Sequence, residues 1–143
     1  MTNPIKIGIT GGIGSGKTTV SKVFELLGVE VFSSDFEAKQ IMLSSPVKQQ
    51  IIELLGTESY LEDGSLSRIY LAGRVFNDKT LLNELNDIVH PAVLDIYLSS
   101  VKQSKGLYVI NEAALHVEKN TGLLDILIVV TADESDRISR VMT

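Results

Sequence analysis

One short segment of the chain combines four glycines with a lysine and two hydroxyl side chains: Gly11-Gly12-Ile13-Gly14-Ser15-Gly16-Lys17-Thr18. This is the pattern G-x-x-x-x-G-K-[ST], in which backbone N–H groups form an anion-binding nest at a helix N-terminus. Glycines allow the required dihedral angles and leave no Cβ in the way of phosphates. Lys17 would bridge the β- and γ-phosphates, and the Thr18 hydroxyl would ligate Mg²⁺. The segment predicts a nucleoside triphosphate site, and the alternative is a turn that packs a strand against a helix.

Two carboxylates stand where they could complete such a site. Asp35 follows a predicted strand, at the sheet edge where ligands of open α/β folds bind. A small-molecule kinase needs a carboxylate there to orient and deprotonate an acceptor hydroxyl, although Asp35 could instead cap a helix. Glu112 ends the apolar run "LYVINE", which has the form of a strand that delivers an acid toward Mg²⁺. The alternative for Glu112 is an ordinary exposed strand-end glutamate.

The elements that must position these residues alternate between strands and helices. Short apolar runs predict strands at 5–10, 29–32, 107–111 and 126–131. Helical spacing and end signals predict helices at 17–27, about 33–43 and 46–55, and a last helix capped by Asp133. Residues 66–105 look wholly helical, with breaks near Asn77-Asp78 and at His90-Pro91.

Strands that alternate with helices imply crossover connections and a parallel sheet covered on both faces. The predicted fold class is therefore α/β, of the P-loop NTPase type. The helical stretch between the second and third strands is too long for a simple crossover. We expect a single domain over residues 1–143, with a core of 1–45 and 106–143 and an inserted helical subdomain of about 46–105.

The amino-acid composition excludes several kinds of binding partner and chemistry. The chain has 143 residues, 44% hydrophobic and 22% charged, as in ordinary globular proteins. A net charge of −5 argues against a broad basic surface, so we expect no nucleic-acid partner. Cysteine is absent, which excludes disulfides, thiolate catalysis and Cys-ligated zinc. No run has the length of a membrane span and no signal-peptide pattern is seen, so we expect a cytoplasmic protein without a membrane partner.

Several segments, in the right order and spacing, resemble the dephospho-coenzyme A kinase family. "IGITGGIGSGKTTVSKVFELLGVEVFSSD" is similar to the opening of these enzymes, and "LEDGSLSRIYLAGRVFND" to a later family segment that contains Asp-Gly and Arg. "HPAVLD" is similar to the family's His-Pro-helix element, and "ADESDRISRVMT" to the approach to its lid. The resemblance covers essentially the whole chain, which a P-loop match alone would not do.

The resemblance implies an activity and a set of roles. The family transfers the γ-phosphate of ATP to the ribose 3′-hydroxyl of dephospho-CoA, the last step of coenzyme A biosynthesis. It implies that Gly12 to Thr19, with Mg²⁺, hold the ATP phosphates and that Lys17 and Asp35 are catalytic, Asp35 as the base. Arg140 aligns with the first lid arginine, which neutralises the transferring phosphoryl group.

The inserted helices would receive the acceptor, with Arg68 and His90 as candidate contacts. Arg68 could equally be a surface arginine of a helix. His90 precedes a proline that can start a helix, and it could simply bond to backbone groups there.

The chain also departs from the family pattern. Ser33 replaces the first acid of an Asp-Ala-Asp element, and residues 114–118, "ALHVE", replace Pro-Leu-Leu-Phe-Glu. Family members continue for several tens of residues beyond the position of Thr143, so the C-terminal part is expected to be missing and apolar surface to be uncovered. Self-association is one expected consequence. A nucleotide-binding fragment or switch module without kinase turnover is the alternative function.

Overall fold

The computed structural model describes residues 3–113 and 123–143 and divides the chain into two compact units. The first unit comprises Met1–Asp35 and Tyr97–Thr143, and the second comprises Phe36–Ile96. The second unit overlaps the expected inserted subdomain of about 46–105, whose bounds stay a prediction. Helices α2 (Ser34–Ile41) and α5 (Lys79–Gln103) run from one unit into the other.

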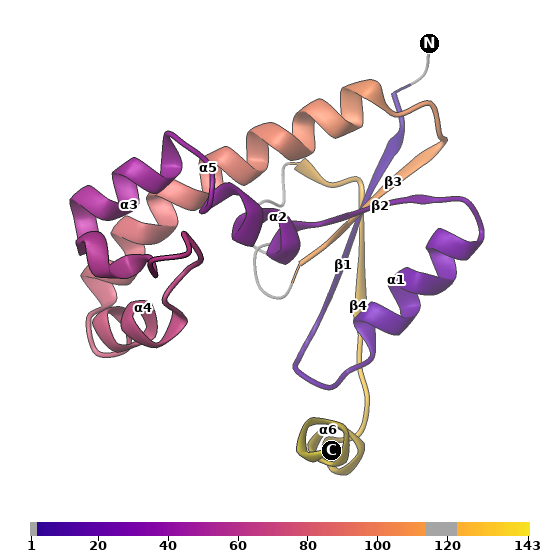
Figure 1. Cartoon of the computed structure of the whole chain (residues 1–143). Coiled ribbons are helices and arrows are strands. Elements are labelled where there is room, and N and C mark those ends of the chain that lie inside the picture. Colours follow the sequence, from indigo (N-terminus) through magenta and orange to yellow (C-terminus); the bar gives the residue numbers. More distant parts are fainter. Residues whose placement is uncertain (1–2, 114–122) are drawn as a thin grey trace. The chain divides into compact units, whose positions relative to one another are not determined.

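The first unit is built on a parallel sheet, drawn in Figure 1. Its described strands have the order β2-β3-β1-β4, and every neighbouring pair is parallel. The register sets Glu112 opposite both Ile9 and Ser33, so the carboxyl ends of three strands meet at one edge. The predicted α/β fold with a parallel sheet is confirmed. The strands are β1 (Ile5–Gly11), β2 (Glu30–Ser33), β3 (Tyr108–Glu112) and β4 (Ile126–Val130).

Helices cover both faces of this sheet. On one face, Val20 and Phe24 of α1 (Lys17–Leu26) pack against a buried cluster that includes Ile9. Val31 of β2 packs against the same cluster, so the next residue, Phe32, points to the opposite face. There the Phe32 ring meets Tyr97 of α5 with centroids 5.3 Å apart. The expectation of helices on both faces is confirmed.

The second unit is helical, as the sequence predicts. It contains α3 (Val47–Leu55), the 3₁₀ turn η1 (Thr57–Ser59) and α4 (Arg68–Val75). Two tyrosine hydroxyls tie its pieces together: Tyr60 donates to the Met42 carbonyl and Tyr70 to the Leu55 carbonyl, each over 2.6 Å. Such bonds each stabilise a fold by about 1 kcal/mol.

The expected helix break at His90-Pro91 is wrong, whereas the break near Asn77-Asp78 is confirmed. Asp78 accepts a 2.9 Å hydrogen bond from the Leu81 N–H, so it caps the start of α5. Helix α5 then runs through Pro91 without interruption. Proline removes one backbone hydrogen bond, but Val89 and Val93 on either side are buried, and this packing outweighs the local cost.

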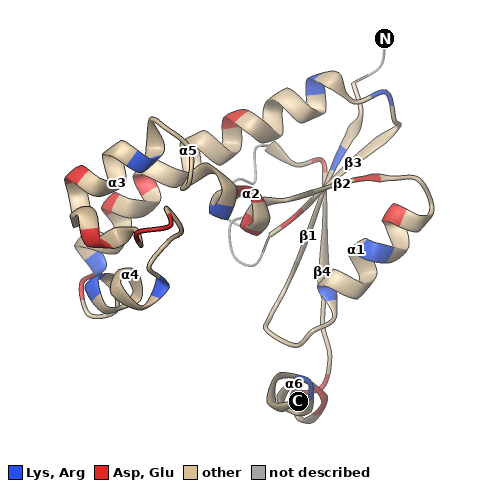
Figure 2. Ribbon diagram, viewed as in Figure 1, with Lys and Arg blue, Asp and Glu red and all other residues tan. Residues whose placement is uncertain are grey.

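The last helix, α6 (Glu134–Met142), follows β4. None of its residues is buried, and three hydrophobic side chains (Ile138, Val141 and Met142) share one side of it with Glu134 and Arg137. Basic and acidic residues are interspersed along the helices of the chain in Figure 2. Among the described residues, no helix has the length and apolar character needed to cross a membrane.

Candidate active site

The glycine-rich loop joins the end of β1 to the start of α1. Gly14 and Gly16 have φ of +76° and +94°, in the left-handed region where side chains other than glycine are strained. The Ser15 N–H donates to the Gly12 carbonyl over 3.0 Å and closes a tight turn. Gly16 is the N-cap of α1, whose first turn contains no acidic residue. The positive end of the helix therefore has no anion of its own and can attract one.

Lys17 and Asp35 meet beside this loop. The Lys17 Nζ lies 3.9 Å from Asp35 Oδ2, and the two side chains are 17% and 46% exposed. Asp35 is the second residue of α2, so the N-cap position of that helix lies before it. The structure brings the predicted lysine and carboxylate together at the carboxyl edge of the sheet.

Thr18 and Glu112 form a second polar pair at the same edge. The Thr18 hydroxyl donates to Glu112 Oε1 over 3.0 Å. A hydroxyl and a carboxylate are the oxygen ligands that suit Mg²⁺. No group of three acidic or histidine side chains gathers as a metal site within the described ranges. Mg²⁺ that accompanies a nucleotide needs fewer protein ligands, because phosphates and water supply the others.

Ser34 and Asn111 add a contact that sequence reasoning missed. The buried Ser34 hydroxyl donates to Asn111 Oδ1 over 2.6 Å, and the bond links the start of α2 to the end of β3. It fixes the segment that carries Asp35 against the strand that carries Glu112. A polar residue late in the apolar run "LYVINE" was the available signal, but the sequence does not identify its partner.

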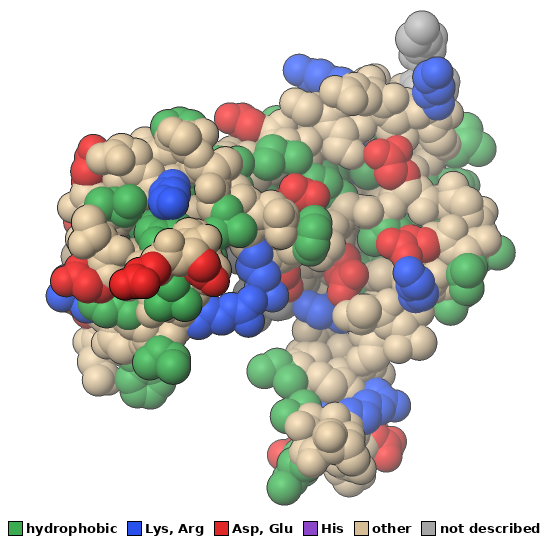
Figure 3. Space-filling model, viewed as in Figure 1, with side chains coloured by type: hydrophobic (Ala, Val, Ile, Leu, Met, Phe, Trp, Pro, Cys, Tyr) green, Lys and Arg blue, Asp and Glu red, His purple; other side chains and the backbone are tan. Residues whose placement is uncertain are grey.

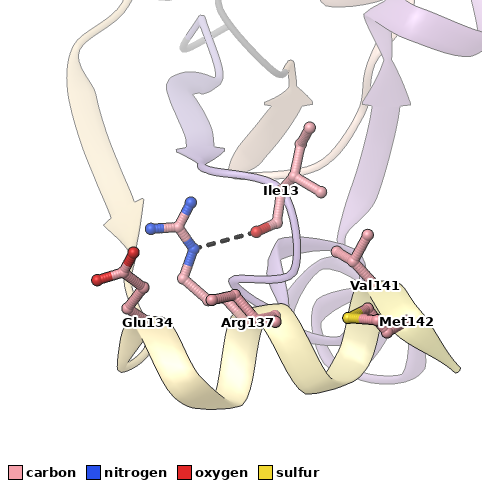
Figure 4. Close-up of a pocket in the computed structure, with 6 residues that line it drawn as sticks. Ile13, Glu134, Arg137, Val141 and Met142 are labelled. Carbon is pink, nitrogen blue, oxygen red and sulfur yellow. Dashed lines mark hydrogen bonds between the residues drawn. The ribbon is translucent and has the colours of Figure 1, made fainter.

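Two arginines of α6 donate hydrogen bonds to backbone carbonyl oxygens of the loop. Arg137 Nε donates to the Ile13 carbonyl over 3.0 Å, as Figure 4 shows. The Arg140 guanidinium donates to the Gly14 carbonyl over 2.9 Å. A hollow beside this contact is lined by Ile13 and one side of α6. Sequence analysis singled out Arg140 but gave Arg137 no role.

The positions of the remaining predicted site residues do not test the roles expected of them. Thr19 is an exposed residue of the first turn of α1. Arg68 is the exposed first residue of α4, and His90 is a half-buried residue within α5. Both belong to the second unit, and their contact with an acceptor stays a prediction. The substituted segment 114–118 lies outside the described residues.

Hydrophobic side chains of α6 reach the surface in Figure 3, at the bottom of the view. Ile138, Val141 and Met142 are all more than half exposed. Exposed apolar groups of this kind favour association with other surfaces. Self-association stays a prediction.

Comparison with known proteins gives the chain a family. The sequence profile of the dephospho-CoA kinase family matches residues 5–143. A dephospho-CoA kinase from Salinibacter ruber is 41% identical over 138 residues, which span 93% of this chain and 69% of the relative. One from Colwellia psychrerythraea is 36% identical, and the match spans 95% of this chain and 68% of the relative.

Solved structures agree with this comparison. A crystal structure from Thermus thermophilus superposes with a TM-score of 0.86 at 32% identity, over 99% of this chain and 72% of that one. A dephospho-CoA kinase from Campylobacter jejuni superposes with a TM-score of 0.64 at 16% identity, which supports the fold alone. The family match over nearly the whole chain, together with the loop and its paired carboxylates, shows that this chain belongs to the dephospho-CoA kinase family.

Proposed function

We propose that the chain transfers the γ-phosphate of ATP to the ribose 3′-hydroxyl of dephospho-CoA, giving coenzyme A and ADP. The observation that carries the proposal is the Lys17–Asp35 pair, 3.9 Å apart beside a phosphate-binding loop. A cation that holds phosphates and a carboxylate that accepts a hydroxyl proton are the two groups that phosphoryl transfer to an alcohol requires.

The proposed roles follow from where each group lies. The backbone from Gly12 to Thr19 would hold the phosphates, and Lys17 would meet charge that develops between the β- and γ-phosphates. Asp35 would orient the acceptor hydroxyl and take its proton. Its partial exposure fits this role, because a base must be reachable by the substrate. Arg140 would leave the Gly14 carbonyl to neutralise the transferring group.

Thr18 and Glu112 would hold Mg²⁺ through a hydroxyl and a carboxylate oxygen, the pair that already meets in the structure. The ion, when bound, neutralises charge on the phosphates. Arg68 and His90 are the proposed acceptor contacts, Arg68 because its exposed guanidinium can bind phosphate groups of dephospho-CoA.

ADP formation with Mg·ATP and dephospho-CoA tests the proposal, and the matched control is an acceptor that lacks only the 3′-hydroxyl. We expect ADP with dephospho-CoA and none above background with the 3′-deoxy analogue. Equal rates with both acceptors would refute transfer to that hydroxyl. Calorimetry with Mg·ATP separates the alternative, because nucleotide binding without any ADP formation would support a binding module.

A further inference from the structure

The contact between α6 and the phosphate-binding loop joins residues that are far apart in the chain. Arg137 Nε and the Ile13 carbonyl are 3.0 Å apart in space and 124 positions apart in sequence. Figure 4 shows the Arg137 side chain extending from α6 to this carbonyl. A hydrogen bond from a charged guanidinium is stronger than one between neutral groups. This bond therefore fixes the Ile13 carbonyl in one direction.

The glycines of the loop make room for this arginine. A Cβ at Gly12 would lie 2.5 Å from a terminal nitrogen of the Arg137 guanidinium. A Cβ at Gly14 would lie 2.7 Å from the Arg137 carbonyl oxygen, which belongs to the backbone of α6. Both distances are shorter than real Cβ contacts allow. The absence of side chains at these two glycines thus lets α6 approach one side of the loop, while the other side is left for phosphates.

The charge of Arg137 has no acidic partner within the described residues, since the ion pairs found there involve only lysines. Its side chain is partly buried against the loop. The guanidinium is therefore directed at a backbone carbonyl, that of Ile13.

The contact at the Ile13 carbonyl also sets the direction of the next N–H group, which can bind a phosphate. The Ile13 carbonyl and the Gly14 N–H belong to one planar trans peptide, so they point in opposite directions. A cation held on the carbonyl side orients the N–H toward the other side and polarises it. An anion that binds there meets a donor already in place, and this lowers the ordering cost of binding.

We infer that Arg137 is a positioning residue for the nucleotide, which fixes the Ile13–Gly14 peptide so that the loop binds the phosphates of ATP and ADP. The inference rests on the proposed nucleotide-binding function. Because the loop holds phosphates in both the ground state and the transition state, Arg137 contributes uniform binding. Its loss should raise KM for ATP and change kcat much less.

Calorimetry of Arg137→Gln with Mg·ADP and Mg·ATP tests the inference. Glutamine keeps an N–H donor of similar reach but removes the charge. We expect both nucleotides to bind about tenfold more weakly, as for the loss of one charge-assisted hydrogen bond. Lys22→Gln is the matched control, because it removes one positive charge from an exposed ion pair on α1 and should leave both affinities unchanged. Adenosine, which lacks phosphates, should bind equally to Arg137→Gln and wild type.

A second variant can still overturn the inference if Arg137→Gln does not fold. Gly12→Ala places its methyl group against the guanidinium, so it should weaken ADP binding in the wild type. In the Arg137→Gln background, where it folds, the same change should cost less. If Arg137→Gln binds ADP as tightly as the wild type, the inference is overturned. The same holds for Gly12→Ala when it is the only variant that folds. A variant that binds ADP and adenosine with equally weakened affinity would also overturn the inference. A wild-type chain that binds no nucleotide would instead overturn the proposed function, and this inference with it.

Discussion

The substitution Asp35→Asn separates a catalytic carboxylate from a structural one, because the two roles differ in magnitude. The Lys17–Asp35 pair spans 3.9 Å, and the Asp35 side chain is 46% exposed, so the pair contributes at most about 1 kcal/mol to stability. A general base contributes about 10²–10⁴ in rate, or about 3–5 kcal/mol of activation free energy. We therefore expect Asp35→Asn to lose at least a hundredfold in kcat and to remain folded. ATP affinity should stay the same or rise, because Lys17 loses a competing carboxylate.

The measurement is ADP release at saturating Mg·ATP and dephospho-CoA, with urea unfolding of the same samples. Glu25→Gln is the matched control, since Glu25 is 42% exposed and pairs with a lysine of α1 over 2.9 Å. Both variants should lose a similar, small amount of unfolding free energy, and only Asp35→Asn should lose rate. If Asp35→Asn kept more than about a tenth of kcat, a loss below about 1.4 kcal/mol, Asp35 would not be the base.

Four further substitutions test separate parts of the site and the fold. Lys17→Ala should lower kcat about 10²–10³-fold with the fold intact, measured by ADP release and circular dichroism, and a loss of less than tenfold would contradict its role at the phosphates. Glu112→Gln should raise the Mg²⁺ concentration needed for half-maximal rate, because a neutral amide is a weaker ligand; an unchanged Mg²⁺ titration would refute a metal role. Tyr97→Phe should not reduce the unfolding free energy in urea, because the buried Tyr97 hydroxyl has no hydrogen-bond partner among the described residues, and its pKa is raised to about 12, chiefly by burial. Tyr70→Phe, which removes a 2.6 Å hydrogen bond, should cost about 1 kcal/mol, and equal losses in the two tyrosine variants would contradict this account.

Local patterns were enough to predict the sheet and the loop. The glycines at 14 and 16 have the positive φ that the motif requires, and this requirement acts within a few residues. Asp35 and Glu112 could be assigned to one edge because parallel strands deliver their carboxyl ends together. These features depend on short-range geometry and on strand direction, both of which the sequence carries.

Pro91 shows where local rules fail. Proline disfavours a helix interior by about 3 kcal/mol, which made a break the natural prediction. Helix α5 continues because Leu85, Val89, Val93 and Tyr97 form one buried stripe at four-residue spacing. Breaking the helix at Pro91 would turn part of this stripe away from its packing partners. Burial of a single such side chain is worth about 1.5–3 kcal/mol, so tertiary packing prevails.

Arg137 and Gly12 show a second way in which sequence reasoning falls short. The glycine-rich motif is recognised, but one physical reason for the glycine at position 12 is missed. The segment "DESDRISR" has the composition of an exposed charged helix, so nothing local distinguishes Arg137 from a surface arginine. Its partner is 124 positions away, and only the fold brings the two together. Gly12 is explained equally well by the approach of a phosphate and by the approach of the guanidinium. The two causes predict different consequences of Gly12→Ala. A methyl group that blocks phosphate weakens nucleotide binding whatever occupies position 137, whereas one that displaces Arg137 does so only while the arginine is present.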